Sequence, residues 1–354
     1  MGLVGACLLA AVVCATSGCS ALAYYAQSVN GHLDLVQRAR PVPEWLADTK
    51  TSDKLKQRLA LSQHIRDFAV RELGLPDNAS YRRYADLQRS AALWNVVAAP
   101  ELSLTLETWC FPVVGCVSYR GYFDRAAADT PAAELRARGL EVNVYAVPAY
   151  STLGKLPFDA LADPLLNTFI DYPEGELARL IFHELAHQVA YARDDTAFNE
   201  SFAAAVERIG SARWFSEPQR NAARDEFQRA EERRHQFRTL TQSFRNRLNV
   251  LYESSAPDSE KRSAKAIVMT QLRADYEQLK TQRWGGYSGY DNWFAHANNA
   301  SFGVLAAYNE LVPAFERLFE RQGRDFPRFY AEVQRLAALP KQERHAALSA
   351  ASAD

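Results

Sequence analysis

The chain has 354 residues, of which 48% are hydrophobic, and its 41 basic and 42 acidic side chains leave a formal net charge of -1. A chain of this length and composition can bury a large core, which excludes a disordered protein. The near-neutral charge provides no general attraction to nucleic acid or anionic lipid, so we expect no nucleic-acid partner and a locally recognised substrate.

The N-terminus has the composition of an export signal. Residues 1–18 carry no charged side chain and are apolar from Leu8 to Ala15, as in the core of a signal peptide. Small residues then precede Cys19, which resembles the cleavage site of bacterial lipoproteins. We predict a signal peptide in residues 1–18 and a lipid anchor at Cys19, with an uncleaved membrane anchor as the alternative. Either interpretation places residues 19–354 outside the cytoplasm, in the cell envelope, and a lipid anchor would tether them to a membrane in the periplasm.

Residues 29–172 predict helical structure followed by a small sheet. Apolar side chains in residues 29–75 are spaced for one face of a helix. Three later segments are rich in Val, Tyr and alternating apolar residues, as half-buried strands are. These segments are residues 93–99, 116–123 and 140–148.

Two cysteines remain in the exported body. Cys110 and Cys116 are separated by five residues, and in an oxidising compartment they can form a disulfide. Two unpaired buried thiols are the alternative. A zinc site at this pair is less favoured, because two thiolates alone do not complete a tetrahedral site.

The most informative segment lies in residues 173–212. His183 and His187 are four residues apart, and residues 176–192 contain no Pro or Gly. Because a helical turn holds about 3.6 residues, both imidazoles lie on one helix face and can bind one zinc ion. Glu184 follows the first ligand, where its carboxylate can act as general base toward a metal-activated water. Two histidines that are merely packed and hydrogen-bonded are the alternative.

A third protein ligand is expected on the next helix. Glu200 lies on a face that can return toward the two histidines, and Thr196 can cap that helix. Asp194 and Asp195 are nearer competitors, but they follow a helix end, where capping roles are common. Glu207 is a conceivable support for a metal ligand. A third histidine of the metzincin kind would fall at Arg193, which excludes that arrangement.

The remainder of the chain predicts further helices. Residues 217–282 contain two charged helical segments, broken at 254–258, each with one apolar seam. A packed helical hairpin is favoured over a lid or partner-binding arm. Residues 283–354 form a helical C-terminal part, which begins with a Gly-rich aromatic turn. Tyr290 in this turn is a candidate for substrate contact, although such residues more commonly pack against the body.

The motifs together resemble a known group of enzymes. H-E-x-x-H at 183–187 with N-E-S-F-A at 199–203 resembles the gluzincins, which are zinc peptidases with a glutamate ligand. With the segment 115–123, Asn298-Asn299-Ala300 and Tyr308, the chain more narrowly resembles a bacterial family of zinc-dependent aminopeptidases that carry a lipoprotein signal. The resemblance implies an α+β, predominantly helical metallopeptidase body in which a small sheet precedes the H-E-x-x-H helix.

Two classes of function follow from these observations. The first is a zinc peptidase of the bacterial cell envelope with one Zn²⁺, held by His183, His187 and Glu200, that acts on a peptide or an envelope protein. Aminopeptidase action follows from the resemblance, and internal cleavage is the alternative. The second class is a noncatalytic binding or assembly lipoprotein with a structural zinc site. The presence of Glu184 argues against it, because a structural site has no use for a base there.

Overall fold

The computed structural model of the chain describes residues 24–351 except 112–114, 150, 153–158 and 217–219. Within this part the protein is α+β and predominantly helical, which confirms the expected class. The predicted signal peptide and Cys19 lie outside the described residues. No helix in the described part is long and apolar enough to span a membrane.

The N-terminal region is less continuous than its apolar spacing predicts. Residues 24–38 form the N-terminal helix, and the chain then breaks into β1 (Arg40–Pro41), α2 (Val42–Ala47) and α3 (Asp53–Arg71). Pro41 and Pro43 explain the break, since proline lacks the N–H that a continuing helix needs. Ser52 starts α3 anew, because its side chain accepts a hydrogen bond from the Leu55 amide.

Three small sheets follow. The main sheet has β3 (Leu93–Pro100) at its centre, antiparallel to β6 (Arg120–Tyr122) and β7 (Leu140–Val147). In the second sheet β2 (Arg83–Ala85) lies between β1 and β8 (Leu165–Leu166) and pairs with both. In the third sheet β4 (Trp109–Phe111) pairs with β5 (Gly115–Val117). The single strand expected at 116–123 is therefore wrong: its two halves pair with different strands.

The two faces of the main sheet differ because successive side chains on a strand point to opposite sides. Trp94, Val96 and Ala98 pack on one face against α4 (Arg125–Ala137), a helix that the sequence patterns did not reveal. On the other face Val97 and Ala99 contact Ala300. This second face also carries Leu93 and Asn95 and looks toward the interior of the molecule.

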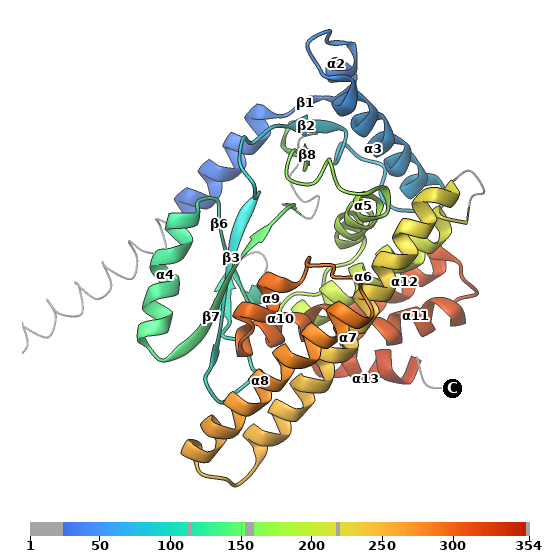
Figure 1. Cartoon of the computed structure of the whole chain (residues 1–354). Helices are drawn as coiled ribbons and strands as arrows, with labels where there is room; N and C mark the ends of the chain where they lie inside the picture. Colours follow the sequence, from blue (N-terminus) through green and yellow to red (C-terminus); the bar gives the residue numbers. More distant parts are fainter. Residues whose placement is uncertain (1–23, 112–114, 150, 153–158, 217–219, 352–354) are drawn as a thin grey trace, which may run out of the picture.

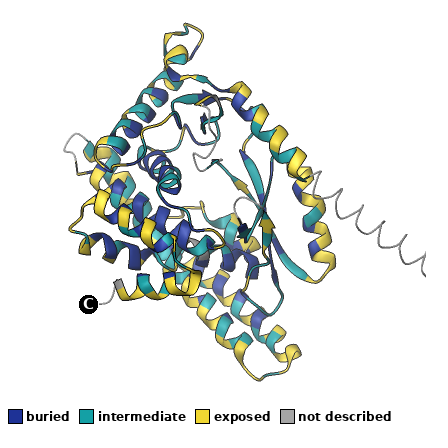
Figure 2. Cartoon of the chain, turned by 180° about the vertical axis from the view of Figure 1, so that it is seen from behind, coloured by how far each residue is buried: buried dark blue, intermediate teal, exposed yellow. Residues whose placement is uncertain are grey.

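The helical part surrounds α5 (Glu174–Val189), which is mostly buried (Figure 2). It packs against α6 (Thr196–Trp214) and α3 within the main hydrophobic core. Two long helices, α7 (Asn221–Glu253) and α8 (Asp258–Gln282), form a hairpin with its own apolar core (Figure 1). The remaining helices are α9 (Asp291–His296), α10 (Asn299–Asn309), α11 (Val312–Arg321), α12 (Phe326–Ala337) and α13 (Lys341–Ala351).

The paired asparagines have a structural role. Asn298 caps α10 through a capping box with Ser301. The Asn299 side chain donates hydrogen bonds to the carbonyl oxygens of Pro100 and Glu101 at 2.9 and 2.8 Å. These contacts tie α10 to the end of β3. The side chain of Tyr308 is outside the described residues.

Candidate metal centre

The helix α5 carries two of the candidate ligands on one side. Glu174 and Glu176 lie in its first turn, where the helix dipole favours negative charge. Its apolar side chains Leu177, Ile181 and Leu185 are fully buried in the main core. The histidines occupy a different face, so the core fixes their orientation.

Three side chains converge next to α5. His183 Nε2 lies 3.1 Å from His187 Nε2 and 3.3 Å from Glu200 Oε2, and His187 Nε2 lies 3.6 Å from the same oxygen. This group could hold a metal ion. A tetrahedral zinc ion with bonds of about 2.0–2.2 Å separates its ligand atoms by roughly 3.3–3.6 Å. The two separations to Glu200 fall in this range and the 3.1 Å between the imidazole nitrogens is slightly shorter. Two imidazoles and one carboxylate are a donor set that zinc accepts.

The turn between α5 and α6 aims Glu200 at the histidines. The Asn199 side chain accepts a hydrogen bond from the Ala192 amide at 2.7 Å and donates one to the Ala192 carbonyl at 2.8 Å. Asp195 is the N-cap of α6 and accepts from the Phe198 amide. The expected cap at Thr196 is therefore wrong by one residue: Thr196 is already helical.

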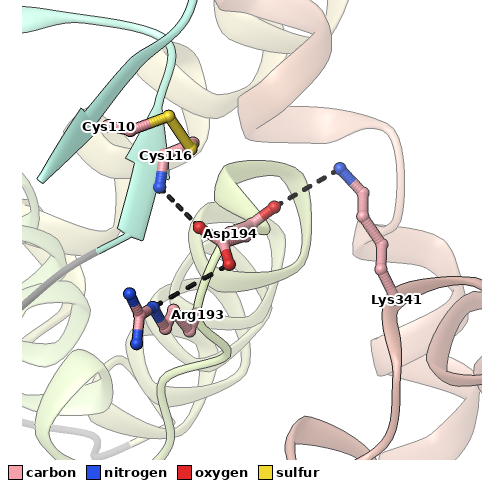
Figure 3. Close-up of a disulfide and its surroundings, with 5 residues drawn as sticks. All are labelled: Cys110, Cys116, Arg193, Asp194 and Lys341. Carbon is pink, nitrogen blue, oxygen red and sulfur yellow. Dashed lines mark hydrogen bonds and ion pairs between the residues drawn. A yellow bond between two sulfur atoms is a disulfide. The ribbon is translucent and has the colours of Figure 1, made fainter. Parts of the chain in front are cut away.

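The two competing aspartates have other partners. Asp194 accepts a hydrogen bond from the Cys116 amide at 2.5 Å, and its backbone oxygen lies 3.5 Å from Lys341 Nζ (Figure 3). Asp195 is fully buried and pairs with Arg344 at 2.5 Å and with His345 at 2.8 Å. Neither aspartate belongs to the group of three candidate ligands. Both hold the turn in place.

The Cys116 residue that contacts Asp194 is part of a disulfide. Cys110 and Cys116 are bonded to each other and occupy facing positions on β4 and β5. Gly115 has a φ of 78°, and a Cβ atom there would overlap the Asp194 carboxylate. Glycine is therefore required at this position for the β4–β5 strand pair to approach the α5–α6 turn so closely. Figure 3 shows this approach, with Asp194 between Cys116 and Arg193.

Glu207 supports the candidate ligand His183. Its Oε2 lies 3.1 Å from His183 Nδ1, and its other oxygen pairs with Arg179. Arg179 also pairs with Glu231 on α7. An acceptor on Nδ1 fixes the ring and leaves Nε2 directed at the metal position, as in many metal sites.

The ionisable groups of the metal-free centre stabilise one another as an ion pair. Burial opposes ionisation of Glu200, but the charges of His187 and His183 outweigh it and lower the Glu200 pKa to about 2. Burial also disfavours a charged His183, yet Glu200 and Glu207 hold its pKa well above the usual value. In the metal-free protein an ionised Glu200 therefore neutralises a protonated His183 at neutral pH, and a metal ion would have to displace that proton to bind the imidazole.

Glu184 and Tyr119 face the same cavity as the three candidate ligands. Burial raises the pKa of Glu184, while the neighbouring histidines oppose the rise. Burial and the charge of Glu200 raise the pKa of Tyr119 well above its usual value, so its hydroxyl stays protonated and can donate. No pattern in the segment 115–123 predicts this position of Tyr119 beside the candidate ligands.

Tyr290 lies elsewhere. It stacks on Phe237 of the hairpin, with ring centroids 4.4 Å apart, and lines a different cavity together with Glu176 and Tyr287. The structure thus does not bring Tyr290 to the candidate ligands.

The arrangement can hold one metal ion, present a carboxylate to a substrate and donate a hydrogen bond from Tyr119. A family model described as "Putative aminopeptidase" matches residues 23–348. Comparisons with curated proteins and with solved structures found no match.

Proposed function

The chain belongs to the family described as "Putative aminopeptidase", a group of peptidases, and on this premise we propose that it is a zinc-dependent peptidase. His183, His187 and Glu200 would hold the zinc ion, and Glu184 would be the general base. The observation that carries the proposal is the convergence of two imidazoles and one carboxylate within 4.8 Å, the donor set of catalytic zinc sites. Ligands on two successive helices are gluzincin-like.

Each side chain has a defined task in this mechanism. A zinc ion held by the three ligands supplies Lewis-acid polarisation of a carbonyl group and of water. Glu184 accepts a proton from water as the water oxygen bonds to the peptide carbonyl carbon, and it returns that proton to the departing amine as the C–N bond breaks. The protonated Tyr119 hydroxyl, which faces the same cavity, is available to donate to the oxygen on which negative charge develops.

The cellular location of the protein and the type of peptide bond it cleaves are part of the same proposal. The uncharged N-terminus and Cys19 support export to the cell envelope and attachment to a membrane through lipid. The family description supports aminopeptidase action on peptides. Cleavage within a chain and a noncatalytic role with a structural metal are the alternatives that an assay has to separate.

The decisive experiment compares Glu184→Gln with the wild type on a peptide library, with metal content measured in parallel. We expect Glu184→Gln to bind zinc like the wild type and to lose roughly 10²–10⁴-fold in kcat. Glu260→Gln, an exposed glutamate on α8, is the matched control and should retain full activity. Undiminished turnover by Glu184→Gln would refute the mechanism, and a zinc-loaded wild type that cleaves no peptide would favour the noncatalytic alternative.

A further inference from the structure

Two cavities border the metal centre, and a third shares part of its wall with one of them. The sheet-side pocket, about 480 Å³, is lined by Leu93, Asn95 and Val147 of the main sheet and by His183 and Glu184. A second cavity of about 220 Å³ also contains His183 and Glu184 in its wall. A third cavity of about 380 Å³ shares part of its wall with the second. The shared residues are Tyr172, Glu176 and Arg234.

We call the second and third cavities together the helix-side channel. Glu184 borders both the sheet-side pocket and this channel. A substrate bond that lies opposite the Glu184 carboxylate would therefore have one side in the pocket and the other in the channel. We propose that the substrate is an extended peptide that crosses the metal centre, with a large apolar side chain in the sheet-side pocket and the rest of the chain in the helix-side channel. This inference rests on the proposed peptidase function and adds its substrate class.

The sheet-side pocket has the chemistry for a large apolar side chain. Leu93 and Val147 are direct partners in the β3–β7 register and both line it. Phe111, Val117 and Phe123 add further apolar surface. The carboxylates among its described lining residues are Glu184 and Glu200, which already belong to the metal centre. Its volume falls within the range of small-ligand sites, most of which are lined by apolar groups.

The helix-side channel has a different character. The carboxylate of Glu207 pairs with Arg179, and that of Glu176 pairs with Arg234 at 2.7 Å. Both of these carboxylates are thus neutralised, whereas the outer part of the channel is also lined by the exposed Glu226 of α7. Such a wall suits a continuing peptide chain, whose amides can hydrogen-bond to polar side chains. Farther out, Tyr287 is 44% exposed and offers an aromatic surface.

The length of the channel sets a minimum length for the substrate. Glu176 and His183 are seven residues apart on α5, which corresponds to about 10 Å along the helix axis. An extended peptide covers at most about 3.3–3.6 Å per residue. About three substrate residues are therefore needed to reach from the metal centre to the level of Glu176, which lines the same outer cavity as Tyr287.

The test measures binding, so that it does not depend on turnover. The full chain carrying Glu184→Gln is loaded with zinc and titrated with fluorescently labelled peptides that differ in length and in one central residue. We expect Phe at that residue to bind at least about tenfold more tightly than Ala, as burial of a large apolar side chain predicts. We also expect affinity to rise as about three residues are added on the channel side.

Variants of each compartment sharpen the test. Val147→Trp fills the sheet-side pocket and should abolish the preference for Phe, whereas Val250→Trp, at a site on α7 that is 70% exposed, should preserve it. Leu93→Ala enlarges the same pocket and should favour Trp over Phe, which keeps the test decisive if Val147→Trp does not fold. Tyr287→Ala should remove the gain from the added residues, and Tyr287→Phe should retain it.

The outcomes separate the two proposals. The cleft assignment is the claim that an extended peptide occupies the sheet-side pocket and the helix-side channel. If peptides bind with these preferences but the zinc-loaded wild type does not cleave them, the proposed function fails and the cleft assignment stands. If the wild type cleaves peptides with no dependence on the central residue or on length, the cleft assignment is wrong and the peptidase function stands. Equal binding of Phe and Ala peptides, or of short and long peptides, also overturns the cleft assignment.

Discussion

Two antiparallel helix pairs in this protein differ in what they bury. The pair α7–α8 has an apolar seam that includes Phe244, Leu248 and Leu272, with charged side chains outside. The pair α5–α6 instead encloses ionisable groups: Glu200 is 8% exposed and His187 is 7% exposed. The hairpin is held by apolar contact, whereas the α5–α6 interface also has to satisfy charge.

This difference indicates which pair carries the chemistry. A buried charge without a partner costs several kcal/mol, so it persists only where other charges or a metal compensate it. In α5–α6 the compensation comes from Arg179 toward Glu207 and from the histidines toward Glu200. Substitutions in the hairpin should therefore change stability, and substitutions in α5–α6 should change metal binding.

Leu248→Ala provides the largest stability effect in the comparison. Leu248 is fully buried in the hairpin core, so truncation should lower the free energy of unfolding by about 2–5 kcal/mol. Val250→Ala, two residues away and exposed, should change it by less than about 0.5 kcal/mol. Urea denaturation measures both values. A loss of zinc affinity in folded Leu248→Ala would show that the hairpin shapes the metal centre after all.

A second prediction concerns pH. Burial raises the pKa of Asp163 to about 7, against opposing hydrogen bonds from Thr152 and Ser151. The unfolded pKa is about 3.9, so the folded state binds more protons between pH 4 and 7, and stability contributed by this group is lost as pH rises through that range. The expected loss is about 4 kcal/mol. Asp163→Asn should remove it, and urea denaturation of the metal-free protein at several pH values measures it.

A control variant, and the different pH range in which other buried carboxylates titrate, make this test specific for Asp163. Asp258→Asn, at the exposed start of α8, should leave the pH dependence unchanged. Glu200 and Glu207, whose pKa values are lowered to about 2, contribute stability above pH 4 that is lost only as pH falls toward 2. A wild type whose stability does not fall between pH 4 and 7 would contradict the assignment of Asp163.

Local sequence patterns predicted several features of the fold and of the candidate metal centre. The spacing of His183 and His187 identified two side chains that the structure brings together, and the apolar seams predicted two helices with a break near residue 254, where α7 ends at Glu253. Such features depend on residues three or four apart, whose relative position a helix determines. The same logic proposed Glu200, because a short turn returns α6 along α5.

Other features depend on contacts between distant segments and could not be found from spacing. The partner of Asp194 is Cys116, 78 residues earlier, and that of Asp195 is Arg344, 149 residues later. The helix expected over residues 29–75 is interrupted near Pro41, because proline ends a helix even where the apolar spacing continues. The cavities around Glu184 have walls from the sheet, α5 and α7, so no local pattern contains them.

The smallest predicted effect concerns Glu207, which contacts His183 without being a candidate ligand. Glu207→Gln keeps an acceptor oxygen but removes the charge opposite His183 Nδ1 and leaves Arg179 with Glu231 alone. Loss of such a supporting contact typically weakens metal binding 10–100-fold, or about 1.4–2.8 kcal/mol. Zinc competition with a chelating dye measures this change.

Glu310→Gln, on a glutamate outside the group around His183, is the matched control and should leave zinc affinity unchanged. Because Gln is nearly isosteric with Glu, the variant should fold and retain the two helices. Unchanged zinc affinity in Glu207→Gln would mean that the apolar packing of α5 alone orients His183. In that case the charge network of α5–α6 would stabilise the helix pair, as the apolar seam stabilises the hairpin, and would not tune the metal centre.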